Sequence, residues 1–410
     1  MSALSEPLRL PCGAELGNRL AKAAMSEQLA TPANGPTAEL VRLYGRWADS
    51  GAGLLLTGNV AVDRTALSEP LNVSVEDERD LDLLRAWAES AAAGGAQVWM
   101  QVNHAGRQSP RYIARRPVAP SAVGVRGLGG TFGTPRELTG AEIEGLVERF
   151  AVTAGIAVRA GFGGVQVHAA HGYLISQFLS PSTNLRSDGW GGDPVRRRRF
   201  LVEVVRAVRA AVGPGTPVSV KLNSADFQRG GLDWEESLEV AGVLEEERVD
   251  LLEISGGTYE SPELLTGRQS TRRSTREREA YFLEFAEKVR ARSAIPLMLT
   301  GGFRTRAGME EAIGGGAVDV VGLARPMALD PGLPARVLAG EDVVSGVEPR
   351  RVGVRRLDGM SELAWHTEQL WRVGRGGEPD PGRHPLRSVL AYAAVSGRDA
   401  LRRGRIRARR

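Results

Sequence analysis

The first 340 residues alternate between short apolar runs and longer segments whose apolar residues recur at helical spacing. The runs are evenly hydrophobic, which is typical of parallel strands buried on both faces. Antiparallel strands with one face in water would instead show hydrophobic and polar residues in turn. The runs lie at 19–24, 53–56, 96–102, 164–168, 218–222, 251–254, 297–300 and 318–321.

The segments between these runs carry the signals of helix ends. A capping-box pattern at Thr139 and Glu142 precedes helical spacing up to residue 159. Asp193 and Pro194 supply an N-cap and a proline at the first helical position, and a glycine ends that helix. Further helices are predicted at 37–48, 80–93, 234–247, 277–291, 306–313 and 333–339.

Eight strand-and-helix units predict an α/β fold, a closed (β/α)8 TIM barrel over residues 1–340. An open doubly wound sheet would carry a glycine-rich phosphate turn after its first strand, whereas the turn at 23–26 reads Ala-Ala-Met-Ser. Residues 341–410 predict a short helical C-terminal extension. It has a helix at 358–371, a glycine- and proline-rich break at 374–385 and an arginine-rich tail.

Charge is unevenly distributed along the 410 residues, which carry a formal net charge of +4. Residues 398–410 contain seven arginines and one aspartate, so the rest of the chain is slightly acidic. Nucleic-acid binding by the protein as a whole is therefore not expected. Contact of the tail with nucleic acid or an acidic partner is an alternative. The tail lacks interleaved aromatic residues, so a frayed helix or a contact within a homo-oligomer fits it better.

No apolar run is long enough to predict a membrane span, and the N-terminus has neither the basic nor the apolar region of a secretory signal. A cytoplasmic location is therefore expected. The single cysteine, Cys12, excludes an intramolecular disulfide and any four-cysteine zinc or iron–sulfur site within the chain. Lysine is also rare, because the 53 basic residues include only Lys22, Lys221 and Lys288 as lysines.

The last two predicted strands end in residues that suit phosphate. Gly301 and Gly302 follow the seventh strand, and the segment from Gly322 to Arg325 follows the eighth. Barrels commonly bind phosphate after these strands through loop amides and a helix N-terminus, and an arginine adds a charge-assisted contact. The pattern predicts a phosphate site, the alternative being glycines that serve tight turns alone.

Lys221 is a cation predicted to lie at a buried strand end. A buried charge without a partner is costly, so this ammonium needs an anionic or electron-rich partner. At about 4 Å and an effective dielectric constant near 20, such a pair is worth about 4 kcal/mol. The partner is either a ligand at the barrel mouth or a neighbouring carboxylate of the protein.

Three side chains with hydrogen-bonding or acid–base chemistry follow the fourth strand, namely His168, His171 and Tyr173. Zinc sites need three or four ligands, and no other strand end supplies a third histidine, so no metal site is predicted. Two neutral imidazoles can instead donate to one substrate oxygen and stabilise the negative charge that develops on it. A phenol with an ordinary pKa near 10 suits proton donation. For each residue alone, a structural role is the alternative.

These residues lie within segments that resemble the Old Yellow Enzyme family of FMN-dependent oxidoreductases and ene-reductases. The resemblance covers roughly residues 10–340 and is most specific over 168–192. The segments that carry it are 18–26, 101–108, 167–181, 184–192, 220–223 and 322–326.

The resemblance implies a non-covalently bound FMN at the barrel mouth, with NADPH or NADH as the electron donor. By motif position, Gln101 would bond the pyrimidine edge of the flavin, and Lys221 would face its N1 and C2 oxygen. The residues implied to line the ring are Ala24, Met25, Ser26 and Gly58. Those implied to hold the phosphate are Gly302, Ala324 and Arg325, and the pattern at the strand ends adds Gly301 and Gly322.

The resemblance also implies a reaction. His168 and His171 would bind the carbonyl oxygen of an α,β-unsaturated carbonyl compound, and Tyr173 would protonate its Cα after the flavin N5 delivers hydride to Cβ. Two loops, 107–138 and 258–275, would set substrate choice. The alternatives are another flavin redox reaction in the same site, such as NADH oxidation, a metal-dependent barrel hydrolase using the two histidines, and a non-catalytic binding barrel.

Two features depart from other members of the family. Ser26 stands where some members carry Cys or Thr; its hydroxyl can still bond the flavin O4, but tuning of the redox potential by a thiol is lost. Members that reduce dienoyl-CoA or oxidise amines carry a cysteine-bound iron–sulfur cluster and a second nucleotide-binding domain. A chain with one cysteine and about 70 residues past the barrel is not expected to be a complete enzyme of that type.

Overall fold

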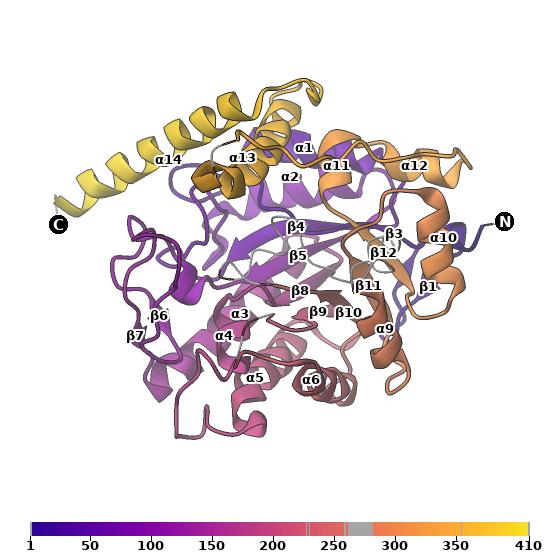
Figure 1. Cartoon of the computed structure of the whole chain (residues 1–410). Coiled ribbons are helices and arrows are strands. Elements are labelled where there is room, and N and C mark those ends of the chain that lie inside the picture. Colours follow the sequence, from indigo (N-terminus) through magenta and orange to yellow (C-terminus); the bar gives the residue numbers. More distant parts are fainter. Residues whose placement is uncertain are drawn as a thin grey trace.

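The centre of the molecule is a closed barrel of eight parallel strands in the order β10-β11-β12-β3-β4-β5-β8-β9 (Figure 1). The computed structural model describes residues 2–226, 228, 230–257, 260, 282–353 and 355–408. The strands are β3 (Leu20–Lys22), β4 (Leu54–Ala61), β5 (Gln97–Asn103), β8 (Gly164–Ala169), β9 (Val218–Asn223), β10 (Leu251–Ser255), β11 (Leu297–Thr300) and β12 (Val320–Leu323). Each of the expected strands is present, and their residues are almost all buried. The predicted TIM barrel is therefore confirmed.

Helices surround the strands, as the apolar spacing predicted. They are α1 (Ala38–Ala48), α2 (Leu81–Ala92), α3 (Gly140–Arg159), α5 (Pro194–Val212), α6 (Trp234–Glu246), α9 (Leu283–Arg290), α10 (Arg306–Gly314) and α12 (Leu333–Leu338). The capping box of α3 is present: Glu142 N donates to Thr139 Oγ1 at 3.2 Å, and Thr139 N donates to Glu142 Oε2 at 2.9 Å. The helix expected at 277–291 is observed as α9, and the first part of that range lies outside the described residues.

A small hairpin that the sequence pattern did not indicate closes the amino end of the barrel. Its strands are β1 (Leu8–Arg9) and β2 (Glu15–Leu16), which pair antiparallel. Leu10 and Leu16 are buried in one cluster with the first residues of β4 and β10. The hairpin therefore fills the end of the barrel opposite the carboxyl ends of the strands.

The register of the strands brings polar residues of the predicted site into adjacent rows. His168 lies opposite Lys221 across β8 and β9, and Lys221 lies opposite Glu253 across β9 and β10. Gln101 of β5 lies opposite Gln166 of β8. Because side chains opposite each other in neighbouring strands share a face, these residues meet inside the barrel.

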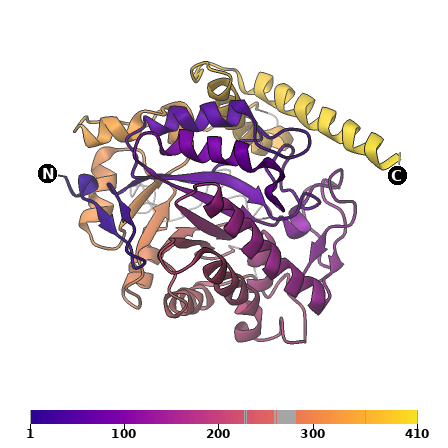
Figure 2. The same ribbon diagram turned by 180° about the vertical axis from the view of Figure 1, so that it is seen from behind.

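Two helices, α13 (Arg355–Gly374) and α14 (Pro385–Ala408), follow the barrel. The predicted helix at 358–371 is confirmed and is longer at both ends. The extension is tied to the barrel by the indole of Trp371, whose Nε1 donates to Glu27 O at 3.0 Å. Figures 1 and 2 show α14 running along one side of the molecule, so the two termini lie at opposite ends.

The arginine-rich tail is helical as far as Ala408, as part of α14. Arg403 in this tail forms an ion pair with Asp399 at 2.9 Å and donates to Asn34 Oδ1 of the barrel at 3.3 Å. The helical interpretation of the tail is therefore confirmed within the described residues, and a contact between subunits stays a prediction. A search of the described residues finds no helix with the length and apolar character that a membrane span requires.

Two further short elements lie near the barrel mouth. They are α4 (Leu174–Leu179), directly after β8, and α11 (Arg325–Leu329), directly after β12. The first of the two loops predicted to set substrate choice is described, and its Arg107 forms an ion pair with Glu260. The second loop, 258–275, lies outside the described residues apart from Glu260.

Candidate active site

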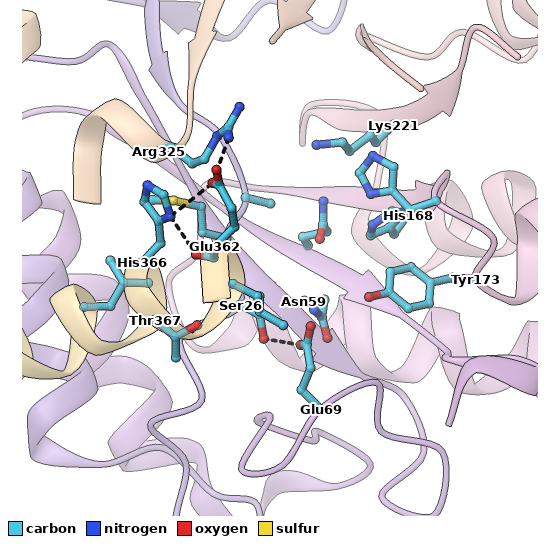
Figure 3. A pocket seen from close by; sticks show the side chains of 16 residues that line it. Ser26, Asn59, Glu69, His168, Tyr173, Lys221, Arg325, Glu362, His366 and Thr367 are labelled. Atoms are coloured by element: carbon cyan, nitrogen blue, oxygen red, sulfur yellow. Dashed lines mark hydrogen bonds and ion pairs between the residues drawn. The ribbon is translucent and has the colours of Figure 1, made fainter. Parts of the chain in front are cut away.

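The carboxyl ends of the strands surround a cavity of about 210 Å³ (Figure 3). Nine of the predicted site residues line it: Ala24, Met25, Ser26, Gln101, His168, His171, Tyr173, Lys221 and Arg325. Figure 3 shows Lys221, His168 and Tyr173 on one side of the cavity and Arg325 and Glu362 on the other. The structure therefore brings together the predicted catalytic residues and all of the residues predicted to contact the flavin ring except Gly58.

A smaller cavity of about 60 Å³ shares Arg325 with the first. Its lining includes the other residues of the predicted phosphate site, Gly301, Gly302, Gly322 and Ala324. Gly301 and Gly302 have φ angles of 130° and 94°, which residues with a side chain rarely adopt. Oγ1 of Thr300 is buried there and has no hydrogen-bond partner among the described residues. Closely approachable glycine backbone, a buried hydroxyl and a guanidinium together fit a phosphate group.

Gly58 lines neither cavity, unlike the other residues predicted to contact the ring. Its N–H donates to Glu27 Oε1 at 2.7 Å. A Cβ at this position would collide with the carboxylate of Glu27 and the carbonyl oxygen of Met25. Glycine here therefore allows β4 to approach the segment that carries Met25 and Ser26.

A chain of buried hydrogen bonds orients Gln101 and Lys221. Glu253 is fully buried and accepts from Lys221 Nζ at 2.8 Å and from Gln166 Nε2 at 2.9 Å. Because a carboxylate only accepts, the amide nitrogen of Gln166 faces Glu253, and its Oε1 accepts from Gln101 Nε2 at 2.7 Å. Gln101 therefore offers Oε1 to a ligand. The sequence predicted either a ligand or a neighbouring carboxylate as the partner of Lys221. The structure shows the carboxylate, which is that of Glu253, and Lys221 also lines the cavity.

His168 and His171 are neutral hydrogen-bonding groups. Burial is the main cause that lowers the pKa of both imidazoles well below the ordinary 6.5, and the ammonium of Lys221 adds to it. His168 Nδ1 accepts from the N–H of Ala170 at 3.2 Å, so the ring proton is on Nε2. His171 Nε2 lies 2.9 Å from Oγ of Ser255, which was not among the predicted site residues.

The turn after β8 holds the three predicted catalytic side chains together. His171 has a φ of 61°, in the left-handed region that residues with a side chain rarely adopt. Its N–H donates to Asn223 Oδ1 at 3.1 Å, which holds this backbone in place. Tyr173 is the N-cap residue of α4, and its ring lies edge-on to His168 with centroids 4.9 Å apart. Figure 3 shows the phenol directed into the cavity.

The cavity also contains residues that were not predicted. They are Asn59 and Glu69 from the barrel, and Glu362, Leu363, His366, Thr367 and Leu370 from α13. Ser26 donates to Glu69 and accepts from Asn72 Nδ2 at 2.8 Å, so its hydroxyl proton faces a protein carboxylate. Asn59 lies near the end of β4, and Glu69 lies in the segment that follows this strand. No signal in the sequence of α13 indicates that it reaches the barrel mouth.

Lys22, the lysine whose role the sequence left open, lies outside the cavity. It is fully buried, and its Nζ donates to Leu56 O at 2.6 Å and to the Tyr44 hydroxyl at 3.1 Å. The ammonium also lies 4.4 Å from the centroid of the Trp47 ring. Burial lowers the pKa of Lys22 to about 8. Lys22 therefore connects β3 to β4 and α1, and it lines neither of the two cavities.

The described part of the chain contains no group of three histidine, cysteine, aspartate or glutamate side chains placed to hold a metal ion. His168 and His171 therefore have no third ligand there, and structural and catalytic zinc sites need at least three protein ligands. The described residues therefore offer no metal site for the alternative of a metal-dependent hydrolase.

Comparison of sequences identifies the family. The pattern of the NADH:flavin oxidoreductase / NADH oxidase family matches residues 3–342. The NADH-dependent flavin oxidoreductase iliE of Neonectria sp. (strain DH2) is 37% identical over 390 residues, which cover 89% of this chain and 51% of that protein. The chain thus spans about half the length of that relative. The protein of the same name from Hypocrea jecorina (strain QM6a) is 39% identical over 363 residues, covering 83% and 90%.

Solved structures show the same likeness in three dimensions. An Old Yellow Enzyme homologue from Zymomonas mobilis superposes with a TM-score of 0.72 at 26% identity, covering 84% of this chain and 95% of that one. Morphinone reductase superposes with a TM-score of 0.71 at 29% identity, covering 85% and 91%. The chain therefore belongs to the NADH:flavin oxidoreductase / NADH oxidase family, the FMN-dependent NAD(P)H oxidoreductases of the Old Yellow Enzyme type.

Proposed function

We propose that the protein reduces the carbon–carbon double bond of a small α,β-unsaturated carbonyl compound at the expense of NADH or NADPH. The observation that carries this proposal is the presence of two neutral histidines, Tyr173 and Lys221 around one cavity at the barrel mouth. FMN, when bound there, supplies the hydride that is added to Cβ of the substrate.

The residues of the two cavities fit FMN. The turns at Gly301, Gly302 and Gly322 would hold the phosphate with backbone amides, and Arg325 would add its charge. Gln101 would accept from the imide N–H of the ring, since its Nε2 is committed to Gln166. Lys221 would place a positive charge at the same end of the ring, where negative charge gathers on reduction. The segment Ala24, Met25 and Ser26 would lie against one face of the ring.

The two histidines would activate the substrate by donating to its carbonyl oxygen. His168 donates through Nε2, because its Nδ1 accepts from the backbone. His171 donates through Nδ1 when Ser255 gives its hydroxyl proton to Nε2 of that ring. Two donors on one oxygen draw electron density away from Cβ and stabilise the enolate that hydride addition produces. Because both pKa values are lowered, the rings keep this neutral form at neutral pH.

Tyr173 would complete the reaction by giving its phenolic proton to Cα. One hydride on Cβ and one proton on Cα turn the double bond into a single bond, and NADH or NADPH leaves oxidised. The phenolate then regains a proton from solvent. Tyr173 is 4% exposed, so the phenol itself is largely buried.

Replacement of Tyr173 separates the two halves of the cycle. Tyr173→Phe should slow reduction of a cyclic enone by about 10²-fold or more, since general acids contribute this much, while reduction of the flavin by NAD(P)H is unchanged. Stopped-flow absorbance follows each half-reaction. Tyr112→Phe is the matched control, because this tyrosine does not line the cavity and its hydroxyl has no partner among the described residues.

Equal losses in both half-reactions of Tyr173→Phe would contradict the proton-donor role. If the purified protein shows no flavin absorption after FMN is supplied, the flavin chemistry fails as a whole. If the flavin-loaded protein oxidises NADH with oxygen but reduces no enone, the reaction is NADH oxidation, and the proposal of alkene reduction is wrong.

A further inference from the structure

One helix of the C-terminal extension, α13, forms part of the cavity wall, and His366 is a buried polar residue on it. His366 is 7% exposed. Its Nδ1 lies 2.8 Å from the carbonyl oxygen of Glu362, one helical turn earlier. A carbonyl oxygen only accepts, so Nδ1 carries the ring proton and Nε2 has a lone pair. This Nε2 is buried, and it has no hydrogen-bond partner among the described residues.

The electrostatics keep this ring neutral. Burial is the main cause that lowers the pKa of His366 to about 4, and the charges of Arg325 and Arg350 lower it further. At neutral pH, Nε2 is therefore an acceptor. A buried acceptor without a donor is unfavourable, because it has given up its hydrogen bond to water on folding. A ligand hydroxyl in the cavity would restore that hydrogen bond.

His366 lies close to the junction of the two cavities. Arg325 lines both cavities, and its Nη1 lies 3.2 Å from Oε2 of Glu362 on the same helix as His366. Figure 3 shows His366 beside Arg325 and Glu362, across the cavity from His168 and Tyr173. The ring is therefore on the phosphate side of the site and away from the expected position of the substrate carbonyl.

The part of a ligand that joins a flavin ring to a phosphate must pass this junction. In FMN that part is a chain of carbons that carry hydroxyl groups, each of which is a hydrogen-bond donor. We propose that His366 Nε2 accepts a hydrogen bond from a hydroxyl group of this chain, so that the C-terminal extension binds the cofactor. The inference rests on the proposed placement of FMN and is independent of which alkene is reduced. The family pattern ends at residue 342, before α13.

Flavin titrations of the full-length apoprotein test this assignment. FMN is compared with lumiflavin, which has the same ring system but a methyl group in place of the phosphorylated chain. Quenching of flavin fluorescence gives Kd for each. His366→Leu should weaken FMN binding about three- to tenfold, the range for one neutral hydrogen bond, and leave lumiflavin binding unchanged. His366→Gln, which retains an acceptor oxygen, should recover part of the FMN affinity.

Met360→Ala is the matched control, because Met360 lies on α13 but is 45% exposed; it should change neither Kd. Equal weakening of FMN and lumiflavin by His366→Leu would show a packing role and overturn the proposal. If His366→Leu leaves the FMN affinity unchanged but raises KM for the enone, the partner of His366 is the substrate and not FMN. That result would also overturn the proposal. If the wild-type protein binds FMN but reduces no enone, the proposal of alkene reduction is wrong. The role of His366 is then still decided by the same FMN and lumiflavin titrations.

Discussion

Single residues of this site depend on partners that are distant along the chain. Glu253 forms an ion pair with Lys221 and, through Gln166, decides which end of the Gln101 amide faces the cavity. Ser255, two residues later, lies at hydrogen-bond distance from Nε2 of His171. The residues that line the cavity and the residues that orient them are therefore different sets.

Removal of Glu253 leaves Lys221 as an uncompensated buried charge. Glu253→Leu should lower the free energy of unfolding by about 3–5 kcal/mol, the usual result of breaking one side of a buried ion pair. Urea denaturation measures this loss. The double variant Lys221→Met/Glu253→Leu should recover most of it, because no charge is left without a partner. Equal stability of the single and double variants would show that the ion pair is not what the single substitution breaks.

The sequence indicated many of the contact residues but not the residues that orient them. The sequence allowed four of the contact residues to be selected, because they lie at or after the carboxyl ends of predicted barrel strands, where active-site residues of barrel enzymes are found. These four are His168, His171, Tyr173 and Lys221. Glu253 can be seen in the sequence as an acidic residue within an apolar run. Whether it faces Lys221, however, depends on the register of the two strands. Register is decided by the closed barrel as a whole, so it could not be read from either strand alone.

At the scale of elements, the barrel strands and helices could be predicted because their apolar residues repeat with a local period. The hairpin β1–β2 could not be predicted, since its strands have two residues each. The helix in α13 was predicted, but its place beside the barrel mouth was not. Docking of α13 depends on tertiary contacts such as that between Trp371 and Glu27, which no local pattern encodes.

The Trp371 contact predicts a coupling between the extension and the cofactor. Trp371→Phe keeps an aromatic ring beside Tyr392 but removes the donor to Glu27 O. It should lower the free energy of unfolding by about 1 kcal/mol and weaken FMN binding, because α13 is then held less firmly. Trp87→Phe is the control, since Trp87 is buried in the core and its Nε1 has no partner among the described residues. It should lower stability and leave the Kd for FMN unchanged; the same change in Kd for both variants would contradict the coupling.

At the scale of the whole molecule, buried neutral histidines make stability depend on pH. Burial lowers the pKa of His104 and His366 to about 4, and that of His168 and His171 well below 6.5. Between about pH 6.5 and pH 4 the unfolded chain therefore binds protons that the folded protein does not bind. Stability rises with pH across this window and falls on acidification.

Urea denaturation from pH 7.5 down to pH 4.5 should therefore show a steady loss of stability. His104 and His366 each account for up to roughly 3 kcal/mol near pH 4, from about 1.4 kcal/mol for each unit of pKa shift. His366→Gln should reduce the slope, and His384→Gln should not, because His384 is exposed. A slope that is the same in both variants would mean that His366 is not neutral in the folded protein.

The position of α13 has a consequence for changing the enzyme. The predicted catalytic and flavin-binding residues that line the cavity are encoded before residue 326, whereas Leu363, Thr367 and Leu370 of the cavity wall are encoded almost 40 residues later or more. Substitutions at these three positions alter the shape offered to a substrate without altering the hydrogen bonds that orient Gln101, His168 and Lys221. Substrate selectivity can therefore be varied separately from catalytic ability, by mutating these three positions of α13 and leaving the barrel intact.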